Sequence, residues 1–290
     1  MAVVVVTDSS ASLPADLVGA LGIDVVPLHV RVGEREVREG VDAFAIDYAS
    51  DSVTTSAPSP GELRGAYAAA LERSGGDGVV GIHLSRQLSA TWEAGRQAAR
   101  DMGAEESVLL VDSLGAGLAT GLPVLAAARC AARGEPLTAV YEAAVAAARN
   151  ARTFIVVNRT EQLRRGGRLS TAAGFFGSEL VSKPVLQLVE GRLELREKVR
   201  TRAKAFATLV AAAEEAAGLG EVALGVQHLG APEAAESLTD RLRERIPAAG
   251  EILTAEFGPA LGVHLGPGAV GVLVLPGGCG GDSGAAGPAR

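Results

Sequence analysis

Short apolar runs alternate with longer helical stretches through the first half of the chain. Residues 3–6 and 79–82 are continuous apolar runs, a pattern typical of strands buried on both faces of a parallel sheet. Helical patterns follow at residues 60–73, 89–102 and 118–132. This alternation predicts an α/β unit in which helices cover both faces of a parallel sheet.

Local signals mark the ends of several expected elements. Ser12 is predicted to cap a first helix with Pro14 in its first turn, and the apolar residues 25–32 are predicted to form a second strand. In the second half, Glu190-Gly191 is predicted to be the two-residue turn of a hairpin. The second half mixes such hairpins with helices, which favours an α+β arrangement.

The change of pattern near Asn150 predicts two lobes. We expect an N-terminal α/β lobe over residues 1–150 and a C-terminal α+β lobe over residues 151–275. Residues 276–290 are rich in Gly, Ser, Ala and Pro, which predicts a disordered tail. Ligands commonly bind between two such lobes.

Composition excludes several classes of protein. Apolar residues make up 48% of the 290 residues, which is enough for a sizeable core, and the net charge of -7 disfavours nucleic-acid binding. The apolar run at residues 114–128 contains Pro123 and is shorter than the ~20 residues of a membrane helix. No signal peptide is visible, and the two cysteines match no metal or disulfide pattern, so we expect a cytoplasmic protein without a transmembrane segment.

Hydroxyl-rich segments flank the expected helices, and each has two interpretations. Residues 7–10 (Thr-Asp-Ser-Ser) follow the first strand, and residues 54–60 and 84–92 precede helices. Turn and cap chemistry explains each of them on its own. The alternative is that they line a ligand site, since sites in α/β sheets lie where strands end. The sequence lacks the glycine-rich motifs that bind the phosphates of a nucleotide, so a nucleotide is not the expected ligand.

Two glycine-rich segments carry a cation or an imidazole. Arg168 lies in Gly166-Gly167-Arg168-Leu169-Ser170. This segment is either a solvated turn or a tight turn that positions the Arg168 guanidinium to bind a carboxylate. His264 lies in residues 258–268, which we expect to be a glycine-rich loop. No second ligand stands at metal spacing, so we predict no metal site. The glycine density suggests that the backbone closely approaches a ligand.

Taken in order, these segments resemble the DegV family over about residues 2–275. The matching segments are Thr7–Ser10 with Leu13-Pro14, Thr55–Ser59, Leu84-Ser85 with Leu88-Ser89, Val111–Ser113, Gly166–Ser170, Lys183–Leu186, Lys198–Thr201, and Gly258-Pro259 with His264–Gly268. Each segment is a weak signal, but their co-occurrence in the family's order is a strong one.

The resemblance implies a two-lobed fold that holds one long-chain fatty acid, such as palmitate, stearate or oleate, in a tunnel between the lobes. By match, Thr55 and Ser89 would hydrogen-bond the carboxylate, with Arg168 and His264 beside the same head group. A buried carboxylate needs such partners, because left unpaired it would be very costly. A protein that only binds and presents the acid would then need no nucleophile, metal or cofactor of its own.

The resemblance also implies a partner protein. In well-studied members a separate ATP-dependent kinase converts the bound acid into an acyl phosphate for phospholipid synthesis. Residues that would offer positive charge to this kinase are Lys198, Arg200 and Arg202. Four departures from the family's usual motifs affect pocket shape, chain-length preference and partner choice: Ala57, Arg86, Ala90 and Trp92.

Two other functions remain open at this stage. A hydrolase would use Ser89 and His264, with Asp112 as the third member of a triad, although no G-x-S-x-G elbow surrounds any serine. A regulator or scaffold would hold the lipid only as a structural element. We expect a monomer.

Overall fold

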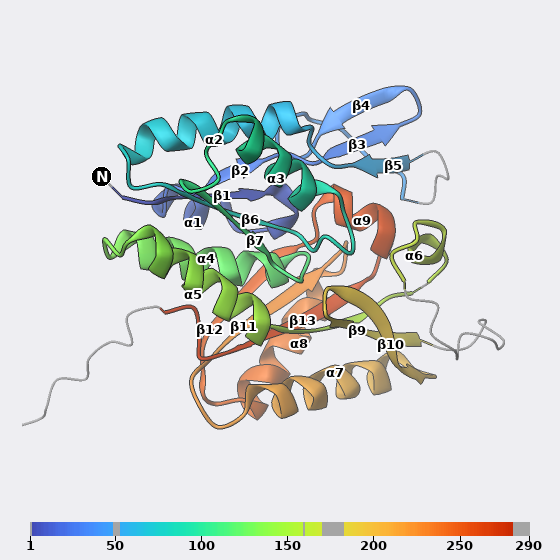
Figure 1. The fold of residues 1–290 in the computed structure, drawn as a ribbon. Coiled ribbons are helices and arrows are strands. Elements are labelled where there is room, and N and C mark those ends of the chain that lie inside the picture. Colours follow the sequence, from blue (N-terminus) through green and yellow to red (C-terminus); the bar gives the residue numbers. More distant parts are fainter. Residues whose placement is uncertain (1, 49–52, 159, 170–182, 281–290) are drawn as a thin grey trace, which may run out of the picture.

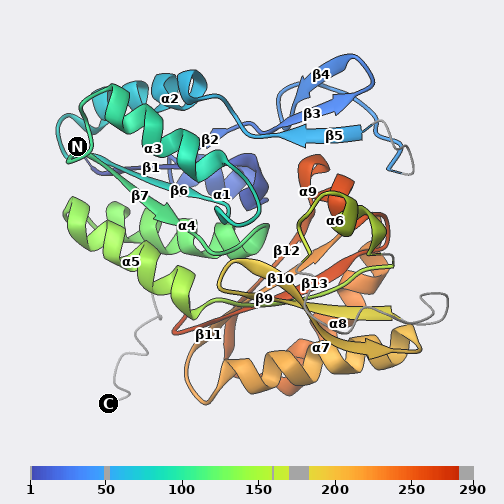
Figure 2. The same ribbon diagram turned by 45° about the vertical axis from the view of Figure 1, so that its right-hand side comes forward.

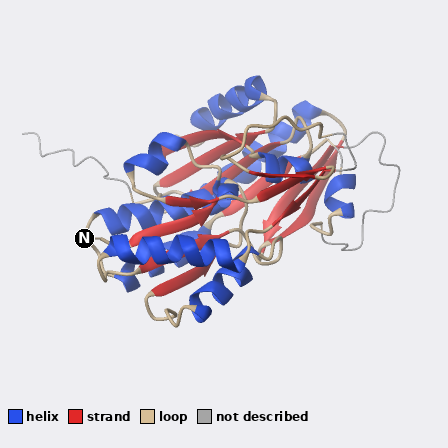
Figure 3. Cartoon of the chain, turned by 90° about the horizontal axis from the view of Figure 1, so that it is seen from above, coloured by secondary structure: helices blue, strands red, loops and turns tan. Residues whose placement is uncertain are grey.

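The chain folds into alternating layers of helices and sheets. The structure is a computed structural model, and it describes residues 2–48, 53–158, 160–169 and 183–280. Figure 1 shows two stacked sheets with helices above, between and below them. Seen from above, most helices run alongside the strands (Figure 3). None of the helices in the described ranges is long and apolar enough to cross a membrane.

The first sheet is parallel, as the sequence predicts. Its strands lie in the order β2-β1-β6-β7, with bounds Val4–Asp8 for β1, Asp24–Val26 for β2, Val79–His83 for β6 and Val108–Asp112 for β7. One face packs against α2 (Pro60–Ser74) and α3 (Thr91–Asp101). The other packs against α1 (Ala15–Ala20), α4 (Leu118–Ala132) and α5 (Leu137–Asn150). Burial on both faces explains why these strands read as continuous apolar runs.

The second sheet is mixed and lies in the C-terminal half. Its order is β10-β9-β8-β13-β11-β12, with bounds Arg152–Val156 for β8, Lys183–Val189 for β9, Arg192–Val199 for β10, Val222–His228 for β11, Ala249–Glu256 for β12 and Val270–Pro276 for β13. Its outer face packs against α7 (Arg202–Ala217) and α8 (Pro232–Arg245). Its inner face meets α4, where Leu273 joins the same apolar cluster as Leu118. Helix α4 is therefore buried between the two sheets.

A third, antiparallel sheet projects from the N-terminal half. Its order is β4-β3-β5, with bounds His29–Val32 for β3, Arg35–Arg38 for β4 and Val53–Ser56 for β5. Figure 2 shows it above α9 (Pro259–Leu265) and α6 (Glu161–Arg165). Val30 and Val37 of this sheet pack with Val263 of α9. The small sheet thereby places β5 against a helix from the other half of the chain.

Two predicted elements are wrong in detail. Residues 25–32 do not form one strand: the run divides at Pro27-Leu28 into β2 and β3, which belong to different sheets. Proline lacks an N–H for a ladder, and Leu28 turns inward to become buried. Ser12 does not cap α1, because it adopts φ +51° at the end of a 3-10 turn and donates to Ser10 O. The N-cap of α1 is Pro14.

The predicted hairpin turn is confirmed. Glu190 and Gly191 have φ values of +47° and +78°, and the flanking Val189 and Arg192 pair across β9 and β10. At the C-terminal end, Pro276 still belongs to β13 and Cys279 is buried, so the described start of the predicted tail is packed. The rest of that tail lies outside the described residues.

Candidate functional site

A mostly apolar cavity lies between the two halves of the chain. We call it the interlobe cavity; it has about 960 Å³ of space not filled by protein atoms, part of it open to solvent. Its lining residues are Leu28, Thr55, Ser56, Ala57, Leu84, Leu88, Ser89, Ala90, Ala116, Ile155, Leu163, Arg168, Leu188, Leu193, Phe257, Ala260, Leu261, His264 and Leu265. All four residues that the family resemblance assigns to a carboxylate are among them.

Thr55 and His264 meet inside this cavity. Thr55 Oγ1 and His264 Nε2 share a hydrogen bond of 2.8 Å, which joins β5 to α9. Residues 259–265 are helical, so the expectation of a glycine-rich loop around His264 is wrong. Pro259 stands at the first position of the helix, where its missing N–H costs nothing, and Gly266 ends the helix with φ +73°.

His264 is a neutral hydrogen-bonding group near pH 7. Burial, aided by the positive charge of Arg168, lowers the pKa of His264 from 6.5 to about 4. Its Nδ1 lies beside Gly166, where an added Cβ would approach it to 3.2 Å. A neutral imidazole can orient a hydroxyl or accept a proton, but it supplies no positive charge.

Arg168 therefore supplies the positive charge at this end of the cavity. Its side chain is half-buried, and Nε donates to Leu88 O at 3.3 Å. Nη1 donates to Gly166 O. These two carbonyls fix the guanidinium so that it faces the cavity. Arg168 and Leu88 also line an outer groove, which adjoins the cavity and contains Arg164, Arg165 and Arg192.

Ser89 is the fourth polar residue and precedes α3. Its hydroxyl lies 2.9 Å from Thr91 Oγ1 and accepts from Thr91 N at 3.3 Å. The side chain is half-buried, and the next residue, Ala90, is exposed. Ser89 thus stands near the mouth of the cavity, where it also helps to begin a helix.

The cap interpretation holds for neighbouring residues of the same segments. Ser59, not Thr55, forms a capping box with Glu62 at the start of α2. Asp8 caps the 3-10 turn at residues 9–11 by accepting from Ser10 N at 3.1 Å. Each hydroxyl-rich segment therefore divides its side chains between local capping and longer-range contacts.

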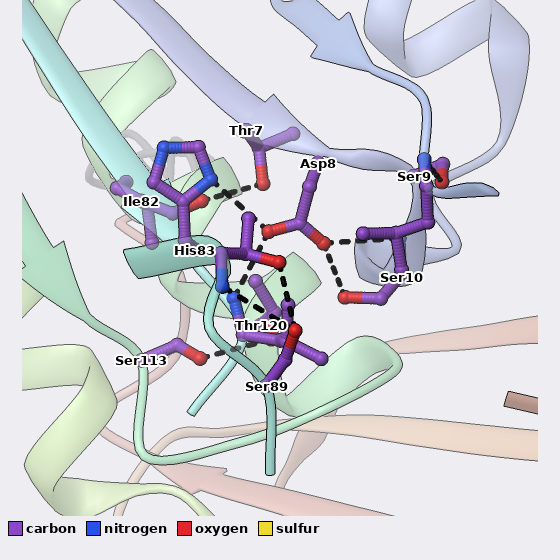
Figure 4. Close-up of polar contacts among 12 residues, drawn as sticks. Thr7, Asp8, Ser9, Ser10, Ile82, His83, Ser89, Ser113 and Thr120 are labelled. Carbon is purple, nitrogen blue, oxygen red and sulfur yellow. Dashed lines mark hydrogen bonds and ion pairs between the residues drawn. The ribbon is translucent and has the colours of Figure 1, made fainter. Parts of the chain in front are cut away.

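A fully buried polar network underlies the Thr-Asp-Ser-Ser loop. Figure 4 shows Asp8 between Ser10 and His83. Asp8 Oδ2 accepts from Leu84 N at 3.0 Å and lies 3.1 Å from His83 Nδ1, and His83 Nε2 pairs with the Tyr67 hydroxyl at 2.7 Å. Neither His83 nor Tyr67 was predicted to belong to a polar network. The available signal was a polar residue ending each of two buried runs, because Asp8 and His83 end neighbouring parallel strands.

Glu39 connects this loop to the helix that carries His264. The carboxylate accepts from Ala260 N at 2.8 Å and from the Ser9 hydroxyl, and it is only 5% exposed. Burial raises the pKa of Glu39. No local sequence pattern predicts this contact, because Glu39 and Ala260 are far apart along the chain.

The three residues of the hydrolase alternative do not form a triad. Ser89 pairs with Thr91, and His264 pairs with Thr55. Asp112 accepts from Leu114 N and forms an ion pair with Arg86 at 3.3 Å. A serine nucleophile needs a histidine in contact and an acid behind that histidine. Within the described ranges, no three His, Cys, Asp or Glu side chains gather as a metal site either.

Comparison with known proteins identifies the family. The family model described as an uncharacterised protein of the DegV family matches residues 2–277. The chain belongs to the DegV family. A DegV domain-containing protein of Mycobacterium tuberculosis is 41% identical over 274 residues, covering 94% of this chain and 97% of the relative.

Solved structures of DegV proteins share the fold. A DegV family protein from Corynebacterium glutamicum is 35% identical with a TM-score of 0.84, covering 96% of this chain and 98% of that one. A DegV family protein from Thermus thermophilus, described by its fatty acid binding, is 31% identical with a TM-score of 0.88 and covers 95% and 100% of the two chains. The predicted DegV-like α/β fold is thus confirmed.

The residues predicted to contact a partner lie away from the interlobe cavity. Lys198 is near the end of β10, Arg200 precedes α7, and Arg202 is the first residue of α7. All three are exposed, and the Arg202 guanidinium lies 5.2 Å from the centre of the Phe206 ring. None of them lines the interlobe cavity, and their role stays a prediction.

Proposed function

We propose that this DegV protein binds one long-chain fatty acid in the interlobe cavity, with its carboxylate at Thr55, Ser89, Arg168 and His264. The observation that carries the proposal is that the lining of the cavity is mostly apolar but includes a small set of polar side chains. Leucine, isoleucine, alanine and phenylalanine side chains form most of it, and these four polar side chains stand among them. An amphipathic ligand with one small polar end matches such a lining.

The apolar lining favours an alkyl chain energetically. Each buried methylene contributes about 0.8 kcal/mol, so a long chain supplies on the order of 10 kcal/mol before the cost of association. That cost falls when the cavity exists before binding. The described apolar lining already surrounds open space.

The polar residues offset the cost of burying the carboxylate. Thr55 and Ser89 offer short hydroxyl donors, and Arg168 offers the cation that the neutral His264 does not. Charge-assisted hydrogen bonds of this kind are about twice as strong as neutral ones. His264 then holds the Thr55 hydroxyl in place through their 2.8 Å contact. The fatty acid binding described for the Thermus thermophilus relative supports the same ligand here.

The same site suits presentation of the acid to a kinase in the cytoplasm. Arg168 and Leu88 line both the interlobe cavity and the outer groove, so the carboxylate would sit where the two meet. A carboxylate oxygen would attack the γ-phosphorus of ATP held by the partner kinase. The bond from that phosphorus to ADP breaks, and ADP leaves with the electron pair. The exposed Lys198, Arg200 and Arg202 would help to dock the kinase.

Lipid analysis tests the binding step. The protein is purified, its lipid is extracted, and the extract is analysed by mass spectrometry. We expect long-chain fatty acid in stoichiometric amount, and delipidated protein is expected to take up palmitate. A protein that carries no fatty acid and takes none up would overturn the proposal.

Kinase reconstitution tests the presentation step separately. Loaded protein is mixed with ATP and a fatty acid kinase from the same cell, and acyl phosphate is trapped with hydroxylamine. The proposal expects acyl hydroxamate only when both proteins are present. Acyl hydroxamate formed by the DegV protein alone would show that it is itself an enzyme. If no kinase of the cell yields the product, the presentation step is wrong and only the lipid-binding step stands.

A further inference from the structure

The β9–β10 hairpin separates the interlobe cavity from a second, more polar cavity. Leu188 and Leu193 of the hairpin line the interlobe cavity. We call the second one the rear cavity; it has about 1150 Å³ of space not filled by protein atoms, part of it open to solvent. Its lining residues are Ser113, Leu114, Ala119, Ala148, Arg149, Ala151, Arg152, Thr153, Phe154, Gln187, Leu188, Val189, Glu190, Gly191, Arg196, Ala212, Glu215 and Ala216. Among the described residues that line the two cavities, Leu188 is the one that they share.

Leu188 packs as a wall between the two spaces. Its half-buried side chain contacts the apolar cluster around α4 and also the cluster that includes Ile155 and Leu193 of the interlobe cavity. The next residue, Val189, lines only the rear cavity and is 37% exposed. Successive side chains of a strand point to opposite faces, so these neighbours differ in which cavity they can affect.

The tip of the hairpin is fastened to the N-terminal half. Ser85 Oγ donates to Gly191 O at 2.9 Å, and Arg192 Nε donates to Gln87 Oε1 at 3.1 Å. Gly191 has φ +78°, and an added Cβ would lie 2.3 Å from Ser85 Oγ. Only glycine allows this approach. The fastened tip keeps Leu188 in one position.

The far side of Leu188 is unfavourable for an alkyl chain. Arg196 pairs there with Glu215 at 3.0 Å and with Gln187 Oε1 at 3.1 Å, and Arg149 and Arg152 line the same space. Methylenes that enter a polar, solvated cavity gain little from burial. The four proposed carboxylate-binding residues do not line the rear cavity, whereas Leu188 lies at the boundary between the two cavities.

We propose that Leu188 is the end wall of the acyl site and sets the longest acyl chain that the protein holds. This inference rests on the proposed fatty acid binding. Truncating Leu188 to alanine vacates apolar space at this boundary, and additional methylenes of a longer acid are buried there. Enlarging Leu188 shortens the acyl site. Val189 has neither effect, because its side chain lies on the other face of β9.

Competition among chain lengths tests the end wall. Delipidated wild-type protein, Leu188→Ala, Leu188→Phe and the matched control Val189→Ala are incubated with an equimolar mixture of saturated acids from laurate to behenate. Bound acids are extracted and quantified by mass spectrometry. We expect Leu188→Ala to raise the ratio of bound arachidate to bound palmitate about tenfold, since the space of a leucine side chain admits two or more extra methylenes. Leu188→Phe lowers this ratio, and Val189→Ala leaves it unchanged.

The outcomes separate this inference from the proposed function. If the wild-type protein binds no acid, fatty acid binding itself is wrong. If the wild type and Val189→Ala bind acids while both Leu188 variants keep the wild-type length profile, the end wall alone is wrong. Should Leu188→Ala fail to fold, the Leu188→Phe profile decides: an unchanged profile overturns the inference, and a shift to shorter acids supports it.

Discussion

Thr55 Oγ1 lies 2.8 Å from His264 Nε2, although 209 positions separate the two residues along the chain. The contact joins the small N-terminal sheet to a helix of the C-terminal half, and both residues line the interlobe cavity. Their separation explains why neither residue looks functional in its own segment. Together with Arg168, they provide an oriented hydroxyl and a cation at the same end of an apolar space.

Replacing Thr55 tests the hydroxyl. Thr55→Val keeps the shape of the side chain but removes its hydrogen bond, and we expect fatty acid affinity to fall by about tenfold to a hundredfold because a charged oxygen loses a donor. Titration of delipidated protein with palmitate measures the change. Thr54→Val is the matched control, since Thr54 is exposed on the same strand and does not line the cavity. Equal affinity in both variants would remove Thr55 from the site.

Replacing Arg168 tests the cation. Arg168→Gln is expected to weaken palmitate binding by at least about tenfold, because a buried carboxylate loses its charged partner. The control is Arg165→Gln, which removes an exposed arginine that pairs with Glu161 outside the cavity. Affinity for 1-hexadecanol, the uncharged alcohol that corresponds to palmitate, should change little in Arg168→Gln. A parallel loss for acid and alcohol would indicate a packing role for Arg168 instead.

The protonation of His264 predicts a pH dependence of stability for the empty protein. Its pKa is about 4 in the fold and 6.5 in the unfolded chain, so between these values the unfolded chain binds more protons. This residue's contribution to stability is therefore complete above pH 6.5 and decreases as the pH falls toward about 4. The loss is on the order of 1–3 kcal/mol, given the partial exposure of the ring.

Chemical denaturation at a series of pH values checks this contribution. His264→Gln keeps a hydrogen-bonding side chain but cannot titrate, so the difference in unfolding free energy between wild type and variant should change across this window. A constant difference from pH 4 to pH 7 would contradict the lowered pKa.

The buried network predicts a stability loss without loss of the site. Tyr67→Phe removes the partner of His83 Nε2 in a fully buried position, and we expect a loss of about 1–3 kcal/mol. Tyr141→Phe is the control, because Tyr141 is only half-buried and lies on the α5 surface. Palmitate affinity, measured well below the melting temperature, should be unchanged in both variants. A large affinity loss in Tyr67→Phe would give the network a direct role in binding.

Strong local patterns were sufficient to predict much of the fold. The continuous apolar residues of β1 and β6 indicated a parallel sheet, and Glu190-Gly191 indicated a tight hairpin. Local pattern failed where tertiary contacts decide. The apolar run at residues 25–32 gave no sign that its two halves join different sheets, and the glycines around His264 concealed a seven-residue helix.

In the site, too, local motifs were sufficient for some residues and tertiary contacts decided the rest. Thr55, Ser89, Arg168 and His264 came from a resemblance between short motifs, and the structure brings them to one cavity. No local rule would have paired Thr55 with His264 or placed Glu39 on the N-terminus of α9. Such contacts depend on how distant elements pack, which a single sequence does not encode in any window of neighbouring residues.

The carboxyl carbon of a bound fatty acid reports most directly on the central claim. Palmitate labelled with ¹³C at its carboxyl carbon is bound to the wild-type protein and to Thr55→Val, and its resonance is followed by NMR as the pH is lowered. We predict a single resonance for the bound acid, and its pH dependence should show that the carboxyl group stays ionised to a lower pH than in free palmitate, because Arg168 and the hydroxyl donors stabilise the anion. The chemical shift of this resonance should differ between the wild-type protein and Thr55→Val. A bound carboxyl that titrates like free palmitate and is identical in both proteins would contradict a carboxylate held at Thr55.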